Sequence, residues 1–134
     1  MASLGTYLAV DGAAAAIDFY KAAFGAEELS RAPMEGMPGK LMHAEVKLFG
    51  GVLMLSDDAG GGESGTVSPT RLGGTSFNLI VSLDAPAEVD AAMARAEKAG
   101  ATVTMPAADM FWGARFGMVR DPFGHMWAFN AERG

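Results

Sequence analysis

Hydrophobic and polar positions follow the same order of patterns twice along the chain. The first run predicts a strand over residues 6–10 and then a helix over 13–24, in which Ile17, Tyr20 and Phe24 recur at helical spacing. Gly25 ends this helix. Alternating positions then predict three strands, at 27–31, 41–49 and 52–56, the last two joined by a tight turn at Gly50-Gly51.

The second run repeats this order with a strand over 76–83, a helix over 87–99, a strand over 101–105 and a hairpin over 115–129. Matching element order at a nearly constant offset indicates an internal repeat. We therefore predict an α+β fold made of two tandem βαβββ modules. They occupy residues 4–58 and 75–131 of a single domain, 1–134, and a Gly-rich linker, 59–74, joins them.

Composition excludes several classes of function. The 134 residues contain no Cys, so disulfides, thiolate metal sites and a Cys nucleophile are all excluded. The net charge of −6, with scattered Lys and Arg, argues against a nucleic-acid partner. No apolar stretch is long enough to span a membrane and the N-terminus lacks the features of a signal peptide, so we expect a cytoplasmic protein with no membrane partner.

Four segments carry a resemblance to a known family. They are Ile17-Asp18-Phe19-Tyr20, His43-Ala44-Glu45, Leu53-Met54-Leu55-Ser56-Asp57 and the run from Arg120 to Trp127, which contains Asp-Pro-Phe-Gly-His. Together with the doubled βαβββ order they resemble the vicinal oxygen chelate superfamily of glyoxalase I, bleomycin resistance proteins and extradiol dioxygenases, and in particular its PhnB-like branch. The resemblance implies a curved mixed sheet around a cavity, and a homodimer.

The resemblance also indicates where a metal would be held. In metal-dependent members each module contributes one ligand from its first strand and one from its last, which correspond here to Gly5, Met54, Asn78 and Ala128. Only Asn78 offers a weak donor, whereas a stable site needs three or four nitrogen or oxygen ligands. We therefore expect no cofactor and disfavour a divalent metal.

Strand parity selects other residues that face the cavity. Pairing across Gly50-Gly51 sets Glu45 opposite Ser56, and pairing across the Asp121–Gly124 turn sets Arg120 opposite His125. His43 and Glu45 then share a face with Met54 and are the candidate catalytic residues, as an oriented base or a ligand pair, although a structural histidine is equally compatible with the pattern.

We name six ligand-binding candidates. Met54 and Met126 would form an adaptable wall, Trp112 lies in a loop where an indole can stack on a ligand, and Arg115 can pair with an anionic group. The full set is Tyr7, Met54, Asn78, Trp112, Arg115 and Met126.

Three functions are compatible with these residues. The first, which we favour, is a protein that binds a small organic ligand without the usual metal site. The second is a metal-dependent lyase, isomerase or dioxygenase with a displaced ligand set such as His43, Glu45 and Asn78. The third is a structural or regulatory dimer without a ligand.

Overall fold

The computed structural model describes residues 1–58 and 66–134. Within them it contains eight strands and three helices, of which the eight strands and the two long helices follow the predicted order. The first module contains β1 (Thr6–Val10), α1 (Ala13–Phe24), β2 (Glu27–Pro33), β3 (Leu41–Leu48) and β4 (Gly51–Asp57). After the short helix α2 (Pro69–Leu72), the second module contains β5 (Asn78–Ser82), α3 (Pro86–Ala99), β6 (Thr102–Asp109), β7 (Ala114–Arg120) and β8 (Met126–Glu132).

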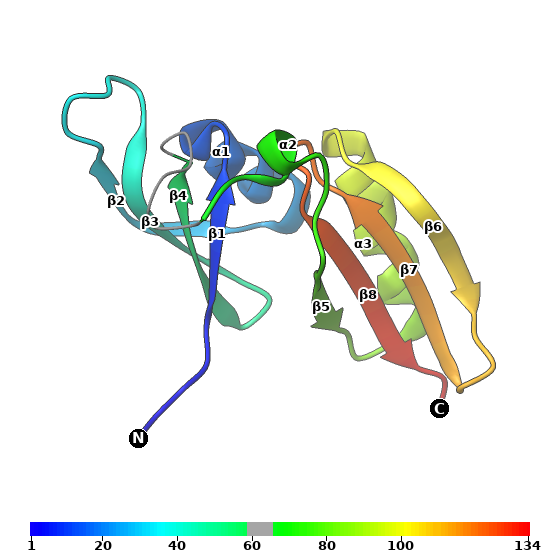
Figure 1. The fold of residues 1–134 in the computed structure, drawn as a ribbon. Coiled ribbons are helices and arrows are strands. Elements are labelled where there is room, and N and C mark those ends of the chain that lie inside the picture. The colour runs from blue at the N-terminus through cyan, green and yellow to red at the C-terminus, as the bar shows by residue number, and fades with distance from the viewer. Residues whose placement is uncertain (59–65) are drawn as a thin grey trace.

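The strands form two four-stranded mixed sheets of identical topology, which confirms the duplicated βαβββ order (Figure 1). The strand order is β1-β4-β3-β2 in one sheet and β5-β8-β7-β6 in the other. In each sheet the first and last strands of the module are parallel, and the other neighbours are antiparallel. β1 and β5 therefore each form a free edge of their sheet.

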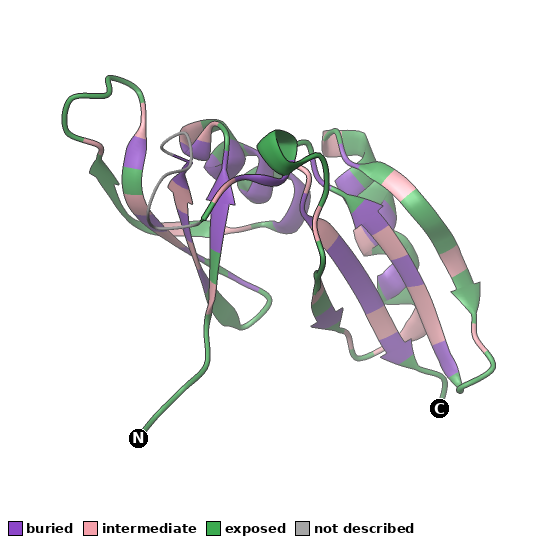
Figure 2. Ribbon diagram, viewed as in Figure 1, coloured by how far each residue is buried: buried purple, intermediate pink, exposed green. Residues whose placement is uncertain are grey.

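One face of each sheet is covered by a helix and the other is open. Along β3, Ala44, Val46 and Leu48 are buried while the residues between them are not, as parity predicts for a half-covered strand (Figure 2). His43, Glu45 and Lys47 thus point to the open face. In the second sheet Trp127 and Phe129 are buried on the helix side.

The two hairpins differ in register from the sequence prediction. Leu48 pairs with Gly51, so the first loop is Phe49-Gly50, whose φ angles of 49° and 76° suit a two-residue hairpin turn. Glu45 consequently lies opposite Met54 and not Ser56. The shift is two residues, and the assignment of residues to faces therefore stands.

The second hairpin has a three-residue loop where a four-residue turn was predicted. The Asp121 N–H donates to the His125 carbonyl at 2.8 Å, and Gly124, with φ at 88°, closes the turn. Arg120 therefore pairs with Met126 and not with His125. A type I turn followed by a residue with positive φ is the usual form of such a loop, and the composition Asp-Pro-Phe-Gly does not distinguish it from a four-residue turn.

The linker holds a helix that the sequence pattern did not indicate. Residues 59–65 lie outside the described residues, but α2 follows them and its Pro69 lies against the second hairpin turn, where a Cβ added to Gly124 would lie 2.6 Å from the Pro69 Cβ. None of the helices in the described residues is long and apolar enough to cross a membrane.

The two modules pack together through their helices and an aromatic cluster. α1 packs on α3, and the rings of Phe24 on α1 and Trp127 on β8 have centroids 4.6 Å apart. Tyr20 is fully buried and also contacts Trp127, at 5.5 Å between ring centroids. A shared core therefore fixes the position of one sheet relative to the other.

Candidate functional site

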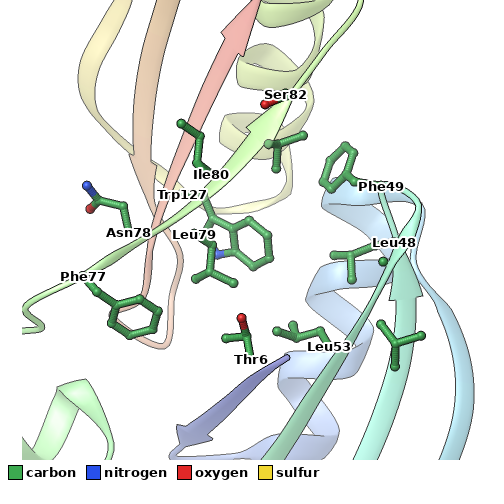
Figure 3. A pocket seen from close by; sticks show the side chains of 13 residues that line it. Thr6, Leu48, Phe49, Leu53, Phe77, Asn78, Leu79, Ile80, Ser82 and Trp127 are labelled. Atoms are coloured by element: carbon green, nitrogen blue, oxygen red, sulfur yellow. The ribbon is translucent and has the colours of Figure 1, made fainter. Parts of the chain in front are cut away.

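A groove of about 540 Å³ lies between the two sheets, where β5 faces the β3–β4 hairpin and the start of β1 (Figure 3). This volume is within the range of sites that hold small organic molecules. Thirteen residues line it, none of them charged: Thr6, Leu48, Phe49, Gly51, Val52, Leu53, Phe77, Asn78, Leu79, Ile80, Val81, Ser82 and Trp127.

The groove owes its apolar character to residues on the helix-facing side of each sheet. Leu79 pairs with Trp127 on one side, and both project toward Leu48 and Leu53 on the other (Figure 3). Within each sheet these apolar residues pack against the helix of that module. Where the two sheets separate, the same residues line the groove. The indole N–H of Trp127 is engaged with Asp121, so the side chains that can form hydrogen bonds with a ligand are Thr6, Asn78 and Ser82.

The catalytic candidates His43 and Glu45 lie on a different surface, the open face of the first sheet. The His43 Nε2 is 2.9 Å from a Glu45 carboxylate oxygen, and its Nδ1 is 2.9 Å from the hydroxyl of Tyr7 on the neighbouring part of β1. The Tyr7 hydroxyl has the Met42 carbonyl as a second acceptor at 3.4 Å. The three side chains are about one third to one half exposed, so solutes can reach them.

The four positions where the superfamily resemblance places a metal have the same geometry in both modules. Tyr7, two residues after Gly5, pairs with Met54, and Ile80, two residues after Asn78, pairs with Ala128. The backbone thus retains both half-sites. Their side chains are a hydrogen, a thioether, an amide and a methyl group, and this set does not fit a divalent metal.

The displaced set of ligands does not fit a metal either. His43 and Glu45 are adjacent, but Asn78 lies at the start of β5 in the second sheet. Both ring nitrogens of His43 already have hydrogen-bond partners. Within residues 1–58 and 66–134 no group of three or more His, Asp or Glu side chains is arranged to hold a metal ion.

The six ligand-binding candidates fall in separate places. Tyr7 and Met54 are paired on the open face of the first sheet, and Asn78 and Met126 are paired in the second. Trp112 lies in the β6–β7 turn beside the end of β8, and it packs on Phe116 at 5.7 Å between ring centroids. The length of β8, seven residues at about 3.3 Å each, separates this turn from Met126. Of the six, only Asn78 lines the groove.

Arg115 is engaged in ion pairs on the helix side of the second sheet. Its guanidinium contacts the Asp90 carboxylate of α3 at 2.6 and 2.8 Å and Asp109 at 3.1 Å. Hydrogen bonds to these carboxylates raise the pKa of Arg115 above its usual value, and the bond from Arg115 lowers the pKa of Asp90. This residue therefore holds α3 against β7, and is not directed toward the groove.

Sequence reasoning missed most of the groove. Phe77 and Ile80, which are 45% and 64% exposed, were assigned only to a strand pattern. One signal in the sequence could have indicated the groove. Both residues lie at the start of the second module, and the βαβββ order makes its first strand an edge of the sheet. The turns indicate which strands pair as hairpins, although not their exact register, whereas the distance between the two sheets depends on how the helices pack.

The doubled βαβββ topology and the duplicated half-sites define the class of protein. Residues 3–129 match the model of the Glyoxalase/Bleomycin resistance protein/Dioxygenase superfamily, and the chain belongs to this family.

Similar proteins agree with this assignment. An uncharacterised protein of Mycobacterium bovis is 47% identical over 131 residues, which are 96% of this chain and 82% of that protein. Among solved structures, TioX from Micromonospora sp. ML1 has a TM-score of 0.74 at 27% identity, with 99% of this chain and 100% of TioX covered. A PhnB protein of Bacillus cereus has a TM-score of 0.73 at 23% identity, with 97% and 99% covered, a likeness that shows the fold.

Proposed function

We propose that this chain is a cytoplasmic binding protein for a small, uncharged and largely apolar organic molecule, held in the groove between the two sheets without a metal. The observation that carries the proposal is the groove itself, which combines a volume of about 540 Å³ with a wall that contains no charged side chain. Binding to such a wall is driven by removing apolar surface from water, at about 25 cal/mol per Å². Thr6, Asn78 and Ser82 would orient one polar group of the ligand.

The side chains at the duplicated half-sites support binding without metal chemistry. Gly5, Met54 and Ala128 supply no nitrogen or oxygen side-chain donor, so the chelation of vicinal oxygens has no ligand set at these positions. The groove requires none, because its contacts are apolar.

The test uses Trp127 as a reporter, since its indole lines the groove. The chain has two tryptophans, so Trp112→Phe leaves Trp127 as the only donor for energy transfer. The probe is N-phenyl-1-naphthylamine, an uncharged aromatic amine that absorbs where tryptophan emits. We expect saturable quenching of Trp127 with one probe per chain.

Two matched variants locate the binding. Phe77 and Leu29 are both exposed apolar residues, but only Phe77 lines the groove. Phe77→Asp places a charge at the groove and should weaken probe binding about tenfold, which corresponds to about 1.4 kcal/mol. Leu29→Asp should leave binding unchanged. Absence of quenching, or an equal loss in both variants, contradicts the proposal.

We further propose that the chain forms a homodimer through its free strand edges. β1 and β5 each leave one side of their backbone unpaired within their sheets, and next to these edges Tyr7, Phe77 and Ile80 are each between 45% and 64% exposed. Unpaired edges with exposed apolar side chains favour association. Sedimentation equilibrium should give the mass of two chains, and the mass of one chain at every concentration would refute the proposal.

A further inference from the structure

We propose that Tyr7, His43 and Glu45 form a proton-transfer site on the open face of the first sheet, with the Tyr7 hydroxyl as the reacting group. The three side chains form one continuous hydrogen-bonded chain, with two contacts of 2.9 Å. This site is separate from the groove, because none of the three residues lines the groove. The inference therefore does not depend on the proposed binding function.

The Glu45 carboxylate selects one tautomer of the neutral His43 ring. It can only accept, so the His43 Nε2 carries the proton and donates to it. Nδ1 is then unprotonated and accepts the single proton of the Tyr7 hydroxyl at 2.9 Å, a shorter contact than the 3.4 Å from this hydroxyl to the Met42 carbonyl. The result is a base that is oriented by a carboxylate and directed at a hydroxyl group, the arrangement that activates a hydroxyl for proton transfer.

The duplicated fold shows that these polar residues are not needed to build the sheet. In the first sheet Tyr7 and Glu45 both pair with Met54, and His43 lies two residues before Glu45. In the second sheet Ile80 and Met118 pair in the same way with Ala128, and Phe116 lies two residues before Met118. The equivalent three residues are therefore Ile80, Phe116 and Met118.

The second module thus builds the same sheet with three apolar side chains at these positions, while the first module carries a phenol, an imidazole and a carboxylate. A structural role of this position in the sheet does not account for that difference. A chemical role for the first module does.

The substrate class is chosen to fit a hydroxyl beside a base on a side chain that is 49% exposed. A carbon acid, whose C–H is acidified by a neighbouring electron-withdrawing group, can approach the hydroxyl from the open face. Tyr7 O takes the proton from carbon while its own proton passes to the His43 Nδ1, and the C–H electron pair stays with the substrate. The imidazolium is stabilised by Glu45 and then releases its proton to water, so charge and protons balance.

The experiment measures base-catalysed elimination of 5-nitrobenzisoxazole by the full chain. In this probe, removal of the ring C–H breaks the N–O bond and releases a coloured cyanophenolate, so no oxidant or metal is required. Tyr7→Phe keeps the ring and removes only the hydroxyl. We expect kcat to fall at least tenfold in this variant, the lower side of what a positioned base contributes.

His43 and Glu45 are positioning residues and need a separate readout. We expect His43→Gln and Glu45→Gln to lower kcat while KM stays unchanged. We expect the double variant Tyr7→Phe/His43→Gln to be no slower than either single variant, because the residues act as a unit. Lys47→Gln is the control for an unrelated base on the same face, and it should retain the wild-type rate.

The outcomes that overturn the proposal are explicit. The proposal is overturned if the wild type is no faster than Tyr7→Phe, which includes the case in which neither exceeds the buffer rate. It is also overturned if Lys47→Gln loses as much activity as Tyr7→Phe. Each variant is compared only after its melting temperature is shown to match the wild type, which is expected because the three side chains are partly exposed. Naphthylamine binding in the groove should be unchanged in all of them.

Discussion

The Asp121 carboxylate connects the two modules, and replacing it with Ala should be strongly destabilising. It is buried in the β7–β8 turn and accepts four hydrogen bonds. Two come from backbone N–H groups of its own turn, at 2.8 and 3.0 Å. The others come from the Tyr20 hydroxyl of α1, at 2.7 Å, and the Trp127 indole, at 2.9 Å.

The size of the effect follows from the donors left behind. Asp121→Ala leaves the hydroxyl of Tyr20 and the indole N–H of Trp127 buried without an acceptor, at about 1–3 kcal/mol each. Of the two turn N–H groups, that of Phe123 is partly buried and loses less, whereas that of His125 is buried. We expect a total of about 4 kcal/mol. For a chain of 134 residues, with an unfolding entropy of about 2.1 cal/mol/K per residue, this lowers the melting temperature by about 14 °C.

A double-mutant cycle between Tyr20 and Asp121, measured by urea unfolding, separates this bond from general damage to the turn. Tyr20→Phe alone should cost about 1.5 kcal/mol, but in the Asp121→Ala background it should be neutral or stabilising, because it removes the hydroxyl that has lost its acceptor. If Asp121→Ala costs less than about 1 kcal/mol, or if the two changes are additive, the carboxylate does not tie the modules together.

Three further predictions concern other parts of the fold. Asp57→Ala should cost about 3 kcal/mol in urea unfolding, because its buried carboxylate accepts from three backbone N–H groups at 2.7 to 2.9 Å, two of them at the start of α1. Gly117→Ala should cost about 1–3 kcal/mol, since the added Cβ would lie 2.9 Å from the Met93 Cε. The control Gly51→Ala should be close to neutral in the same assay, because the atom nearest to its Cβ, the Leu48 carbonyl oxygen, is 3.9 Å away. Burial, and then the charge of Asp121, raise the pKa of Tyr20 well above its usual value of 10.0. The stability that the Tyr20 hydroxyl contributes is therefore complete below pH 10 and declines as the pH rises further. Above pH 10 the melting temperature should fall more steeply for the wild type than for Tyr20→Phe.

The fold could be predicted from the sequence because each element carries its own local signal. The helix over Ala13–Phe24 has apolar residues at helical spacing and a glycine at its end, and its predicted bounds coincide with the observed ones. The predicted registers of the two hairpins were wrong. A Gly-Gly pair suggests a turn, but the loop that forms is Phe49-Gly50, because Phe49 adopts a positive φ and its ring contacts Phe24 and Phe129. A tertiary contact thus decided a local geometry.

The candidate site could be predicted only within a sheet. Parity placed His43 and Glu45 on the open face, and the structure shows their direct contact at 2.9 Å. The contact between Tyr7 and His43 depends on β1 pairing with β4, in which Tyr7 lies opposite Met54, 47 residues later in the chain. Local sequence patterns do not specify that pairing. Arg115 was assigned to ligand contact because it can pair with an anionic group. In the structure that group is Asp90 of α3, and no local pattern connects a strand residue with a helix residue 25 positions earlier.

The same side chain links the stability of the molecule to its groove. Trp127 donates its indole N–H to Asp121, packs on Phe24 and also lines the groove between the sheets. The proposed ligand binding would therefore depend on the terminal hairpin, although the residues of its turn do not line the groove. The hairpin fixes the orientation of one wall. Changes at Asp121 that leave the chain folded should thus weaken probe binding, whereas changes at Tyr7 or His43, on the opposite face of the first sheet, should not.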